Sequence, residues 1–297
     1  MTRVVTAGET MALLDPEREG ELELGDLLRL RFAGAESNFA IALARLEVPV
    51  AWISRLGADR LGVLIRDTLR AEGVDVRWVR SDRDAPTGLF YKWRADGRTS
   101  VAYHRRGSAA SRLEPADVPD EALEGAALVH LTGITLALGD GPRELVLDVA
   151  RRARAAGAIV TFDPNYRPAL WESPAAAAAA IEPVLEHVSW YLCGADDTLF
   201  EQDALLERVV EGVVARTAGS ALLARGDSRI EVAPPRREEV VDEVGAGDAF
   251  AAGFAYGLLQ GWEAPECVRA AHTIAARALR GTGDWETLPR RDDVFPR

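Results

Sequence analysis

Short apolar runs alternate along the chain with longer segments whose apolar residues recur at helical spacing. The runs predict buried strands, and the segments predict helices that pack on them. The predicted strands are Val4–Ala7, Val50–Ile53, Ala127–Leu131, Ile159–Phe162, Trp190–Leu192, Val213–Ala215 and Ala221–Ala224. The predicted helices are Ala35–Leu46, Leu61–Leu69, Glu144–Ala156, Ala175–Glu186, Asp248–Gln260 and Pro265–Arg280. This alternation predicts an α/β fold, in which a mostly parallel sheet has helices on both faces.

Two segments, 13–32 and 87–105, alternate like strands instead. In the second, the turn Ala95-Asp96-Gly97 separates two alternating runs, and Asp-Gly in that setting is a strong hairpin signal. The two segments therefore predict a small sheet that covers a site or meets a partner subunit. No long linker or fixed-period repeat divides the chain, so residues 1–297 are predicted to form one domain with this sheet as its lid.

The composition restricts the partners and the compartment. The formal net charge of -12 disfavours nucleic acid and anionic membranes as main partners. The apolar part of the N-terminus is short for a signal peptide, and no run of about 18 apolar residues predicts a spanning helix. Cys193 and Cys267 are the only cysteines, which favours a reducing compartment and excludes a structural zinc site built from cysteines alone. Cytoplasm is the expected location.

Two classes of nucleotide enzyme lack their motifs here. Lys92 is the only lysine, and no Gly-Lys-Ser/Thr tripeptide for a phosphate loop exists. A Schiff-base enzyme would have to use Lys92, whose alternating neighbours favour a solvated strand residue. A Rossmann dehydrogenase needs Gly-x-Gly-x-x-Gly after its first strand, whereas Gly8-Glu9-Thr10-Met11-Ala12 stands there.

The most informative segment surrounds Gly245-Ala246-Gly247-Asp248, where a strand ends and a helix begins. Glycines allow close approach to the backbone, and the first amides of a helix lack internal partners, so such a turn favours an anion. An aspartate beside a bound phosphoryl group is suited to accept the proton of an attacking hydroxyl. The alternative is an ordinary helix N-cap, for which aspartate is also favoured.

The wider sequence resembles a known family. Residues Asp242–Phe250 resemble the C-terminal signature of the ribokinase-like, PfkB-type carbohydrate kinases. Gly34–Ala40 resembles their N-terminal sugar-binding signature, and Arg55–Gly62 resembles the segment after it, at matching spacing. The resemblance implies a three-layer α/β/α fold with a β lid, ATP and Mg²⁺ as cofactors, and a homo-oligomer joined through the lid.

Three further features resemble the branch of this family that phosphorylates 2-keto-3-deoxygluconate: Tyr103–Ser111, Phe162–Trp171 and Gly283-Asp284. The resemblance implies that Asp248 is the base and that the amides of Gly245, Ala246 and Gly247 bind the transferring phosphate. It places the sugar acid against Gly34, Asn38, Tyr103, Arg105, Arg167 and Asp284. It also places Asn165 near the phosphates, with His272 and Ala276 near the adenine.

The residue types agree with part of this assignment. Arginine binds a carboxylate with a planar fork of donors, and Arg105 and Arg167 both follow strand-like runs, where α/β sheets place their ligands. Taken singly, each would be interpreted as a surface arginine, and His272 as a structural or surface histidine.

The sequence departs from the family mainly where nucleotide binds. Cys193-Gly194-Ala195-Asp196 replaces Asn-x-x-Glu, which leaves Asp196 as a magnesium ligand through water. Ala215–Ser220 replaces Lys-x-Gly-x-x-Gly, which leaves Arg216 and Gly219 as nucleotide contacts beside Cys193. Ala33 and Glu47 also stand where glycine is common.

Three hypotheses remain from the sequence. The first is an ATP-dependent kinase for the primary hydroxyl of 2-keto-3-deoxygluconate. The second is the same reaction on fructose, ribose or a related keto-deoxy sugar acid. The third is a sugar-acid sensor that has lost nucleotide affinity, for which the altered segments at Cys193 and Ala215 are the motivation.

Overall fold

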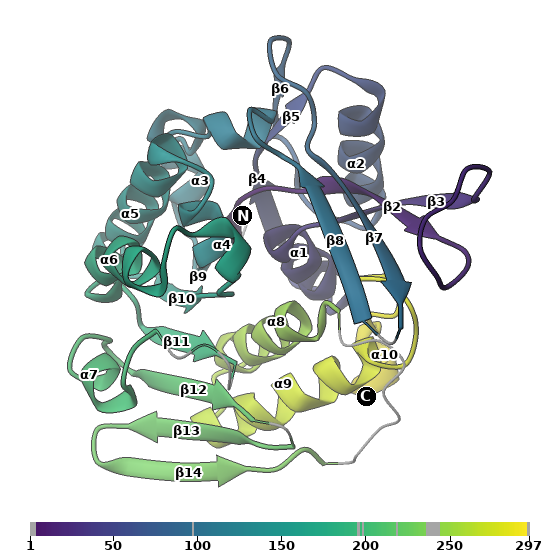
Figure 1. Ribbon diagram of the computed structural model, residues 1–297. Coiled ribbons are helices and arrows are strands. Elements are labelled where there is room, and N and C mark those ends of the chain that lie inside the picture. Colours follow the sequence, from purple (N-terminus) through teal and green to yellow (C-terminus); the bar gives the residue numbers. More distant parts are fainter. Residues whose placement is uncertain are drawn as a thin grey trace.

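The computed structural model describes residues 4–96, 98–194, 197, 199–217, 219–235 and 244–295. Its centre is an eight-stranded sheet (Figure 1). The strands in spatial order are β14 (Ser228–Val232), β13 (Ala221–Arg225), β12 (Gly212–Arg216), β11 (Trp190–Cys193), β10 (Ile159–Asp163), β9 (Leu128–Thr132), β1 (Val4–Ala7) and β4 (Val50–Ile53). Every neighbouring pair from β12 to β4 runs parallel, whereas β13 and β14 form an antiparallel edge.

Helices cover both faces of this sheet and bury one apolar cluster on each. On one face lie α1 (Ala35–Arg45), α2 (Arg60–Ala71), α8 (Ala246–Leu259), α9 (Ala264–Ala278) and α10 (Arg291–Val294). The other face carries α3 (Asp120–Leu123), α4 (Gly133–Leu136), α5 (Asp140–Ala155), α6 (Pro174–Leu185) and α7 (Gln202–Leu206). Short 3-10 helices are η1 (Ala109–Arg112), η2 (Pro115–Asp117) and η3 (Pro168–Leu170). The predicted three-layer α/β/α architecture is confirmed.

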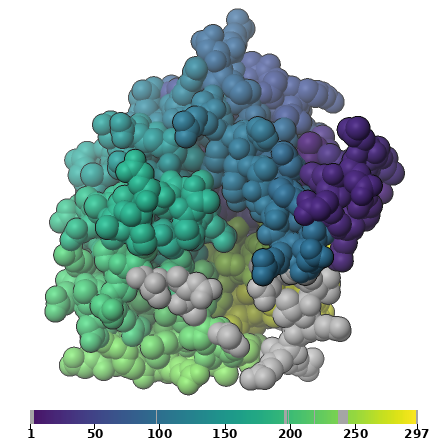
Figure 2. All heavy atoms as spheres, in the orientation of Figure 1, coloured from purple at the N-terminus to yellow at the C-terminus, as the bar shows by residue number. Residues whose placement is uncertain are grey.

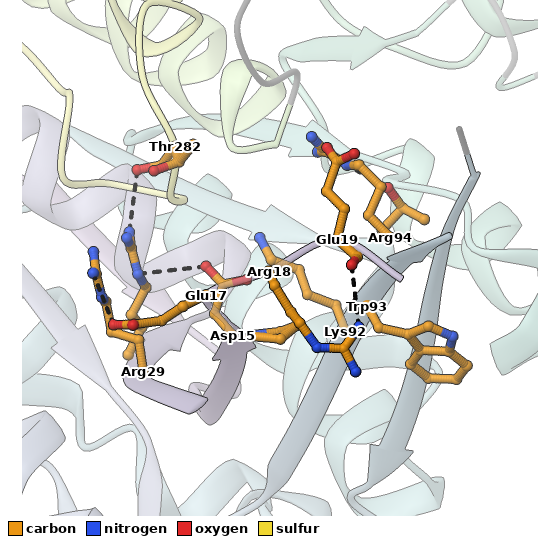
Figure 3. A pocket seen from close by; sticks show the side chains of 12 residues that line it. Asp15, Glu17, Arg18, Glu19, Arg29, Lys92, Trp93, Arg94 and Thr282 are labelled. Carbon is orange, nitrogen blue, oxygen red and sulfur yellow. Dashed lines mark hydrogen bonds and ion pairs between the residues drawn. The ribbon is translucent and has the colours of Figure 1, made fainter. Parts of the chain in front are cut away.

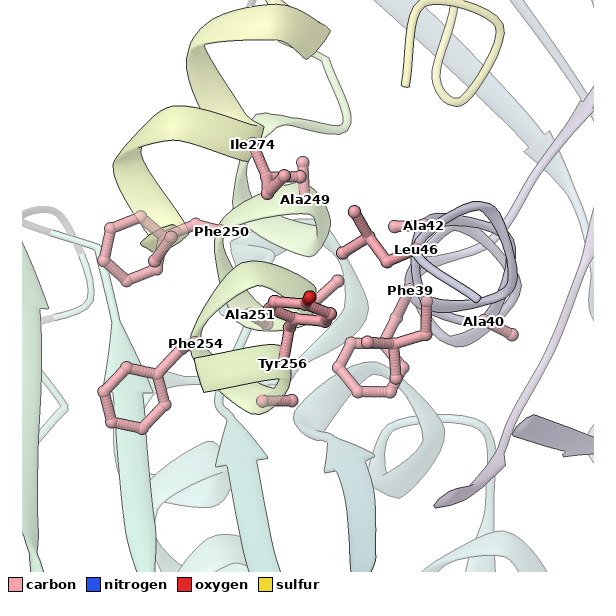
Figure 4. Close-up of a cluster of buried hydrophobic side chains, with 14 of the residues drawn as sticks. Phe39, Ala40, Ala42, Leu46, Ala249, Phe250, Ala251, Phe254, Tyr256 and Ile274 are labelled. Carbon is pink, nitrogen blue, oxygen red and sulfur yellow. The ribbon is translucent and has the colours of Figure 1, made fainter. Parts of the chain in front are cut away.

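Helix α8, which begins at the predicted site, is deeply buried from Ala249 to Gly257. It packs between α1 and α9, with Phe250, Phe254 and Tyr256 among the apolar side chains around it (Figure 4). A Cβ at Gly253 would lie 2.7 Å from the Ala271 Cα, so this glycine allows α8 and α9 to approach closely. Tight packing on several sides fixes the position of the first turn of α8, which carries Asp248.

A four-stranded sheet projects from the main body. Its strands in spatial order are β3 (Leu28–Ala33), β2 (Met11–Pro16), β7 (Leu89–Ala95) and β8 (Arg98–His104). Strands β7 and β8 pair antiparallel from Leu89↔His104 to Ala95↔Arg98, which confirms the predicted hairpin. Asp96 in its turn has a positive φ of 50°, as an Asp-Gly hairpin turn requires, whereas Gly97 lies outside the described residues.

The predicted strand character of segment 13–32 is wrong in its middle. Strands β2 and β3 occupy only the two ends, and residues 17–27 form turns and bends. Gly20 and Gly25 adopt positive φ values of 120° and 97°, which interrupt extended backbone. The charged residues in this stretch are largely exposed, so their alternation with leucine does not mark a buried face.

The main-body strands and helices predicted from periodicity are all present, with ends that differ by a few residues. The pattern did not reveal β14, because its side chains are mostly exposed. It also did not reveal β5 (Arg55–Gly57) and β6 (Arg80–Asp82), a two-stranded parallel sheet too short to show a period. Within the described residues, no helix is both long and apolar enough to cross a membrane.

Candidate active site

The turn before α8 brings two predicted segments together. Gly245 precedes the helix with a φ of +76°, and a Cβ there would lie 2.1 Å from the Asp284 carbonyl oxygen. Only glycine fits this conformation and this contact. The glycine therefore allows the buried Asp284 to lie against the start of α8, where the amides of Ala246, Gly247 and Asp248 lack partners within the helix. Asp284, for which the resemblance implied a sugar-acid contact, thus lies beside the start of α8.

Asp248 is held by two amide side chains from different elements. Asn38 Nδ2 in α1 donates to its Oδ2 at 2.8 Å, and Asn165 Nδ2 after β10 donates to its Oδ1 at 3.4 Å. Burial raises the pKa of Asp248 to about 7, an effect that Asp163 and Asp284 add to and that Asn38 and Arg167 oppose. A carboxylate with such a pKa is suited to accept a proton near neutral pH.

The N-terminus of α1 supplies the sugar-side residues Gly34 and Asn38. Gly34 is the N-cap, and a Cβ there would lie 2.3 Å from the Glu9 carbonyl oxygen, so a side chain would push α1 away. The backbone N–H of Asn38 donates to the Gly34 carbonyl oxygen. Among the described atoms, the buried side-chain Oδ1 of Asn38 has no hydrogen-bond partner. An unpartnered buried acceptor beside Asp248 is suited to a ligand hydroxyl.

The same helix end is anchored by Glu36. Its Oε1 accepts hydrogen bonds from the hydroxyls of Thr132 and Thr135, at 2.6 and 2.7 Å, and burial raises its pKa. These bonds fix the first turn of α1 to the carboxyl end of β9.

Tyr103 and Arg105 lie at the base of the small sheet. Register places Leu13, Phe90 and Tyr103 on one face, and the Phe90 and Tyr103 rings stack with centroids 5.6 Å apart. The Arg105 guanidinium lies 5.6 Å from the Tyr103 ring centroid. It also forms an ion pair with buried Glu9, a residue to which the sequence motifs gave no role.

Arg167 lies opposite, in the segment after β10. Asn165 has a positive φ of 38°, which turns the chain so that Arg167 follows at the surface. Among the described residues, its side chain makes no hydrogen bond or ion pair. It is nevertheless close enough to lower the pKa values of Asp248 and Asp163 electrostatically. Arg167 is thus a cation at the site without an internal partner in the described structure.

The predicted nucleotide side is centred on Arg216 at the end of β12. Both terminal nitrogens of its guanidinium lie 3.3 Å from Asp163 Oδ2, and Nη1 donates to the Gly247 carbonyl at 3.1 Å. The same group stacks 5.5 Å from the Phe250 ring centroid. Burial raises the pKa of Asp163 despite this arginine.

Cys193 and the residues after it form the neighbouring part. Burial raises the pKa of the Cys193 thiol to about 12, so the thiol is neutral. Asp197 accepts hydrogen bonds from the amides of Gly194 and Tyr166, at 2.8 and 3.1 Å. Asp196, the predicted magnesium ligand, lies outside the described residues. The adjacent pair Asp196-Asp197 was the signal that could have identified Asp197 as a candidate.

His272 and Ala276 lie together on α9, away from Asp248. His272 Nε2 lies 3.0 Å from the Val232 carbonyl oxygen at the end of β14, and its ring meets Phe250 edge-on at 5.3 Å. Gly219 lies between β12 and β13, where its amide donates to the Thr217 carbonyl. These residues border the far end of the nucleotide side. No cluster of three or more His, Cys, Asp or Glu suited to a metal occurs in the described part of the chain.

The surface is hollowed between the hairpin β7–β8 and the facing part of the main body (Figure 2). A separate cavity of about 350 Å³ lies farther out, between the small sheet and the loop at Thr282 (Figure 3). Arg29, Arg31, Lys92 and Arg94 contribute to its lining, whereas Asp248 and Arg167 do not. The site predicted at the start of α8 is therefore distinct from this cavity.

The chain resembles known proteins over nearly its whole length. A 2-dehydro-3-deoxygluconokinase from Bacillus subtilis is 35% identical, over 98% of this chain and 93% of its own. A 2-dehydro-3-deoxygalactonokinase from Haloferax volcanii is 34% identical, over 94% and 91%. The crystal structure of a PfkB protein from Polaromonas sp. JS666 superposes with a TM-score of 0.88 at 34% identity, covering 99% of both chains. Residues 1–291 match the family described as pfkB family carbohydrate kinase, and the chain belongs to that family.

Proposed function

We propose that this carbohydrate kinase transfers the γ-phosphoryl group of ATP to the primary hydroxyl of 2-keto-3-deoxygluconate. The observation that carries the proposal is the position of Asp248. Its carboxylate lies at the start of α8, is held by Asn38 and Asn165, and has a pKa near 7. Arg167, which has no side-chain partner among the described residues, lies close enough to act on it electrostatically. The relatives from Bacillus subtilis and Haloferax volcanii, both named as keto-deoxy sugar-acid kinases, support the substrate class.

In the proposed mechanism, ionised Asp248 accepts the proton of the primary hydroxyl as the hydroxyl oxygen attacks the γ-phosphorus, and the bond from that phosphorus to the β,γ-bridging oxygen breaks to release ADP. Asn38 and Asn165 orient the carboxylate by their hydrogen bonds. The amides of Gly245, Ala246 and Gly247 stabilise the negative charge on the transferring group, as helix N-termini do for phosphates. The protein thus contributes mainly positioning and fixed dipoles, which is typical of phosphoryl transfer.

The acid end of the substrate would meet Arg167, Arg105 and Tyr103, with Gly34 and Asp284 at the sugar. Arg167 supplies an uncompensated positive charge, which a carboxylate needs and a neutral sugar does not. The small sheet, residues 13–32 and 87–105, would act as the lid over this end.

Leu28 and Leu30 in β3 are 41% and 45% exposed, and we expect a second copy of the chain to cover them. Analytical ultracentrifugation tests this, and a monomer at micromolar concentration would contradict it.

ATP would lie along Asn165, Cys193, Arg216 and Gly219, with its base toward His272 and Ala276. The residues also fit a hydrated magnesium ion. Asp163 at the end of β10 and Asp197 shortly after β11 each offer carboxylate oxygens as metal ligands. The two carboxylates are close enough that the charge of Asp197 raises the pKa of Asp163. Magnesium bound there would neutralise charge on the ATP phosphates, and the amide bonds to Asp197 would orient its carboxylate.

The test is an ADP-release assay of the wild type and Arg167→Ala across 2-keto-3-deoxygluconate, its C4 epimer, fructose and ribose. We expect the wild type to phosphorylate a keto-deoxy sugar acid. In Arg167→Ala, the KM for that acid should rise roughly 10- to 100-fold, because the variant loses the free energy of one charge-assisted hydrogen-bonded pair. Arg143→Ala, an exposed arginine on α5, is the control. A preference for fructose or ribose that Arg167→Ala leaves unchanged would exclude the sugar-acid assignment.

Titration calorimetry with ATP and magnesium separates a kinase from a sensor, because a sensor would not bind ATP saturably.

A further inference from the structure

The four strands of the small sheet join the main body around one buried carboxylate, that of Glu9. Glu9 lies between β1 and β2 and is 2% exposed. Gly34 follows β3, Gly88 precedes β7, and Arg105 follows β8. Each of these connections approaches Glu9, so the base of the sheet is organised around a single residue.

The contacts are close and specific. Arg105 Nε donates to Glu9 Oε2 at 2.7 Å, and Arg105 Nη2 lies 2.5 Å from the same oxygen. Ser108 Oγ donates to Glu9 Oε1 at 2.6 Å. A Cβ at Gly88 would lie 2.9 Å from that Oε1, and a Cβ at Gly34 would lie 2.3 Å from the Glu9 carbonyl oxygen. Both carboxylate oxygens of Glu9 therefore accept hydrogen bonds from residues at the base of the sheet.

This arrangement gives the two site arginines different tasks. The Glu9 carboxylate neutralises the charge of Arg105 and binds the Nε and Nη2 edge of its guanidinium. Arg105 can therefore donate its remaining N–H groups to a ligand, but it contributes little net positive charge. Arg167 has no partner among the described side chains and keeps its full charge. A guanidinium fixed by a buried carboxylate also loses little freedom when it binds a ligand.

We propose that Glu9 is a positioning residue that holds Arg105 beside Tyr103 and fixes the base of the lid for the incoming sugar acid. The proposal rests on the proposed function, in which Arg105 contacts that substrate. Glu9 acts only through Arg105 and does not touch the substrate itself.

A double-mutant cycle tests this: wild type, Glu9→Gln, Arg105→Ala and the double variant, assayed on the best acceptor found for the wild type. We expect Glu9→Gln to raise the acceptor KM about tenfold, with kcat and the KM for ATP nearly unchanged, because one charge-assisted contact is no longer held in place. In the Arg105→Ala background, Glu9→Gln should raise the KM no further, since the two residues act as one unit.

Thermal unfolding of the same four proteins supplies a second readout. Arg105→Ala leaves Glu9 buried without its cation and should lower Tm, and adding Glu9→Gln should restore most of that loss. Glu211→Gln, a main-body carboxylate that pairs with Arg225 at the surface, is the matched control and should change neither KM nor Tm. Wild-type KM values in Glu9→Gln, or additive effects in the double variant, would overturn the proposal.

The cycle also separates the two levels of inference. If the wild type phosphorylates only neutral sugars, the proposed sugar-acid function fails, and the cycle on that sugar still decides whether Glu9 acts through Arg105. If a sugar acid is the acceptor and the cycle is additive, the proposed function stands and the role of Glu9 is wrong.

Discussion

The halves of the site proposed for the sugar and for the nucleotide each contain a buried carboxylate paired with an arginine, but the two pairs lie differently relative to the start of α8. The Glu9–Arg105 pair lies at the base of the lid, with Ser108 as a further donor. The Asp163–Arg216 pair lies against the start of α8, because Arg216 also donates to the Gly247 carbonyl. The Glu9–Arg105 pair lies at the edge of the proposed sugar half. The Asp163–Arg216 pair lies in the region where the phosphates of ATP would bind.

This difference indicates how each ligand would enter. On the sugar side, the polar groups are held by contacts that a ligand need not break, with Asn38 already bonded to Asp248. On the nucleotide side, the guanidinium of Arg216 must keep or exchange an internal contact when phosphates arrive. The departures of the sequence from its family lie on this same side, at Cys193 and at Ala215–Ser220. We therefore expect the sugar half to be preorganised and the nucleotide half to rearrange.

The largest effect is expected at Asp248, which both halves share. Asp248→Asn keeps the shape but removes the proton acceptor, so kcat should fall roughly 10³-fold while sugar binding is retained. Single-turnover kinetics and calorimetry with the sugar measure the two separately. Asp227→Asn, at an exposed turn, should behave as wild type. Near-normal turnover in Asp248→Asn would remove the base from the mechanism.

Arg216→Ala tests the nucleotide half. The change leaves Asp163 buried without its cation, so the free energy of unfolding should fall by about 3 kcal/mol, and Asp163→Asn in the same chain should recover most of it. We expect the KM for ATP to rise while the KM for the sugar is unchanged. A lower KM for ATP would mean that Arg216 obstructs the phosphates and does not bind them. Arg225→Ala, whose surface pair with Glu211 lies on the next strand, is the control.

The pKa of Asp248 gives a pH dependence of both rate and stability. The base must be ionised, so kcat should rise with pH through about 7. The folded pKa lies above the value of 3.8 for an unperturbed aspartate, so the folded state binds the proton more tightly. Its contribution to stability is therefore greatest at low pH and is lost as pH rises from about 4 through about 7.

Thermal melts compare the wild type with Asp248→Asn between pH 5 and pH 9. The asparagine variant should gain a few degrees of Tm relative to the wild type at high pH, because it carries no buried charge there. Identical pH dependence of Tm in the two proteins would contradict the raised pKa.

The smallest effect is expected far from both halves, after α1. Glu47 has a φ of +62°, a left-handed conformation that costs most residues about 1 kcal/mol and that glycine adopts freely. Glu47→Gly should therefore stabilise the protein by about 0.5 kcal/mol, which chemical denaturation can measure. Glu47→Ala keeps the strain and should show no gain. If Glu47→Gly and Glu47→Ala were equally stable, the backbone conformation at position 47 would not be a source of strain. The kinetic constants of both should match the wild type.

Periodicity predicted the main body because most of its strands are short apolar runs buried in the sheet and most of its helices carry apolar residues at helical spacing. The signatures at Gly34–Ala40 and Gly245–Asp248 also predicted residues that meet in the structure, since Asn38 bonds Asp248. The partners of Glu9 could not be predicted, because Arg105 and Ser108 lie far along the chain and only the tertiary structure brings them to Glu9. Arg216 was predicted as a nucleotide contact, but its bonds to Asp163 and Gly247 depend on how three separate strand and helix ends converge.

Strand β2 pairs in parallel with β7, although roughly 70 residues containing α1, β4 and α2 separate them in the chain. Such a pairing carries a large loop-closure cost, which is recovered only after the intervening elements have packed. The four-stranded sheet is therefore expected to assemble late in folding, after the main body has packed. A chain in that interval would have Asp248 in place while water still reached it freely.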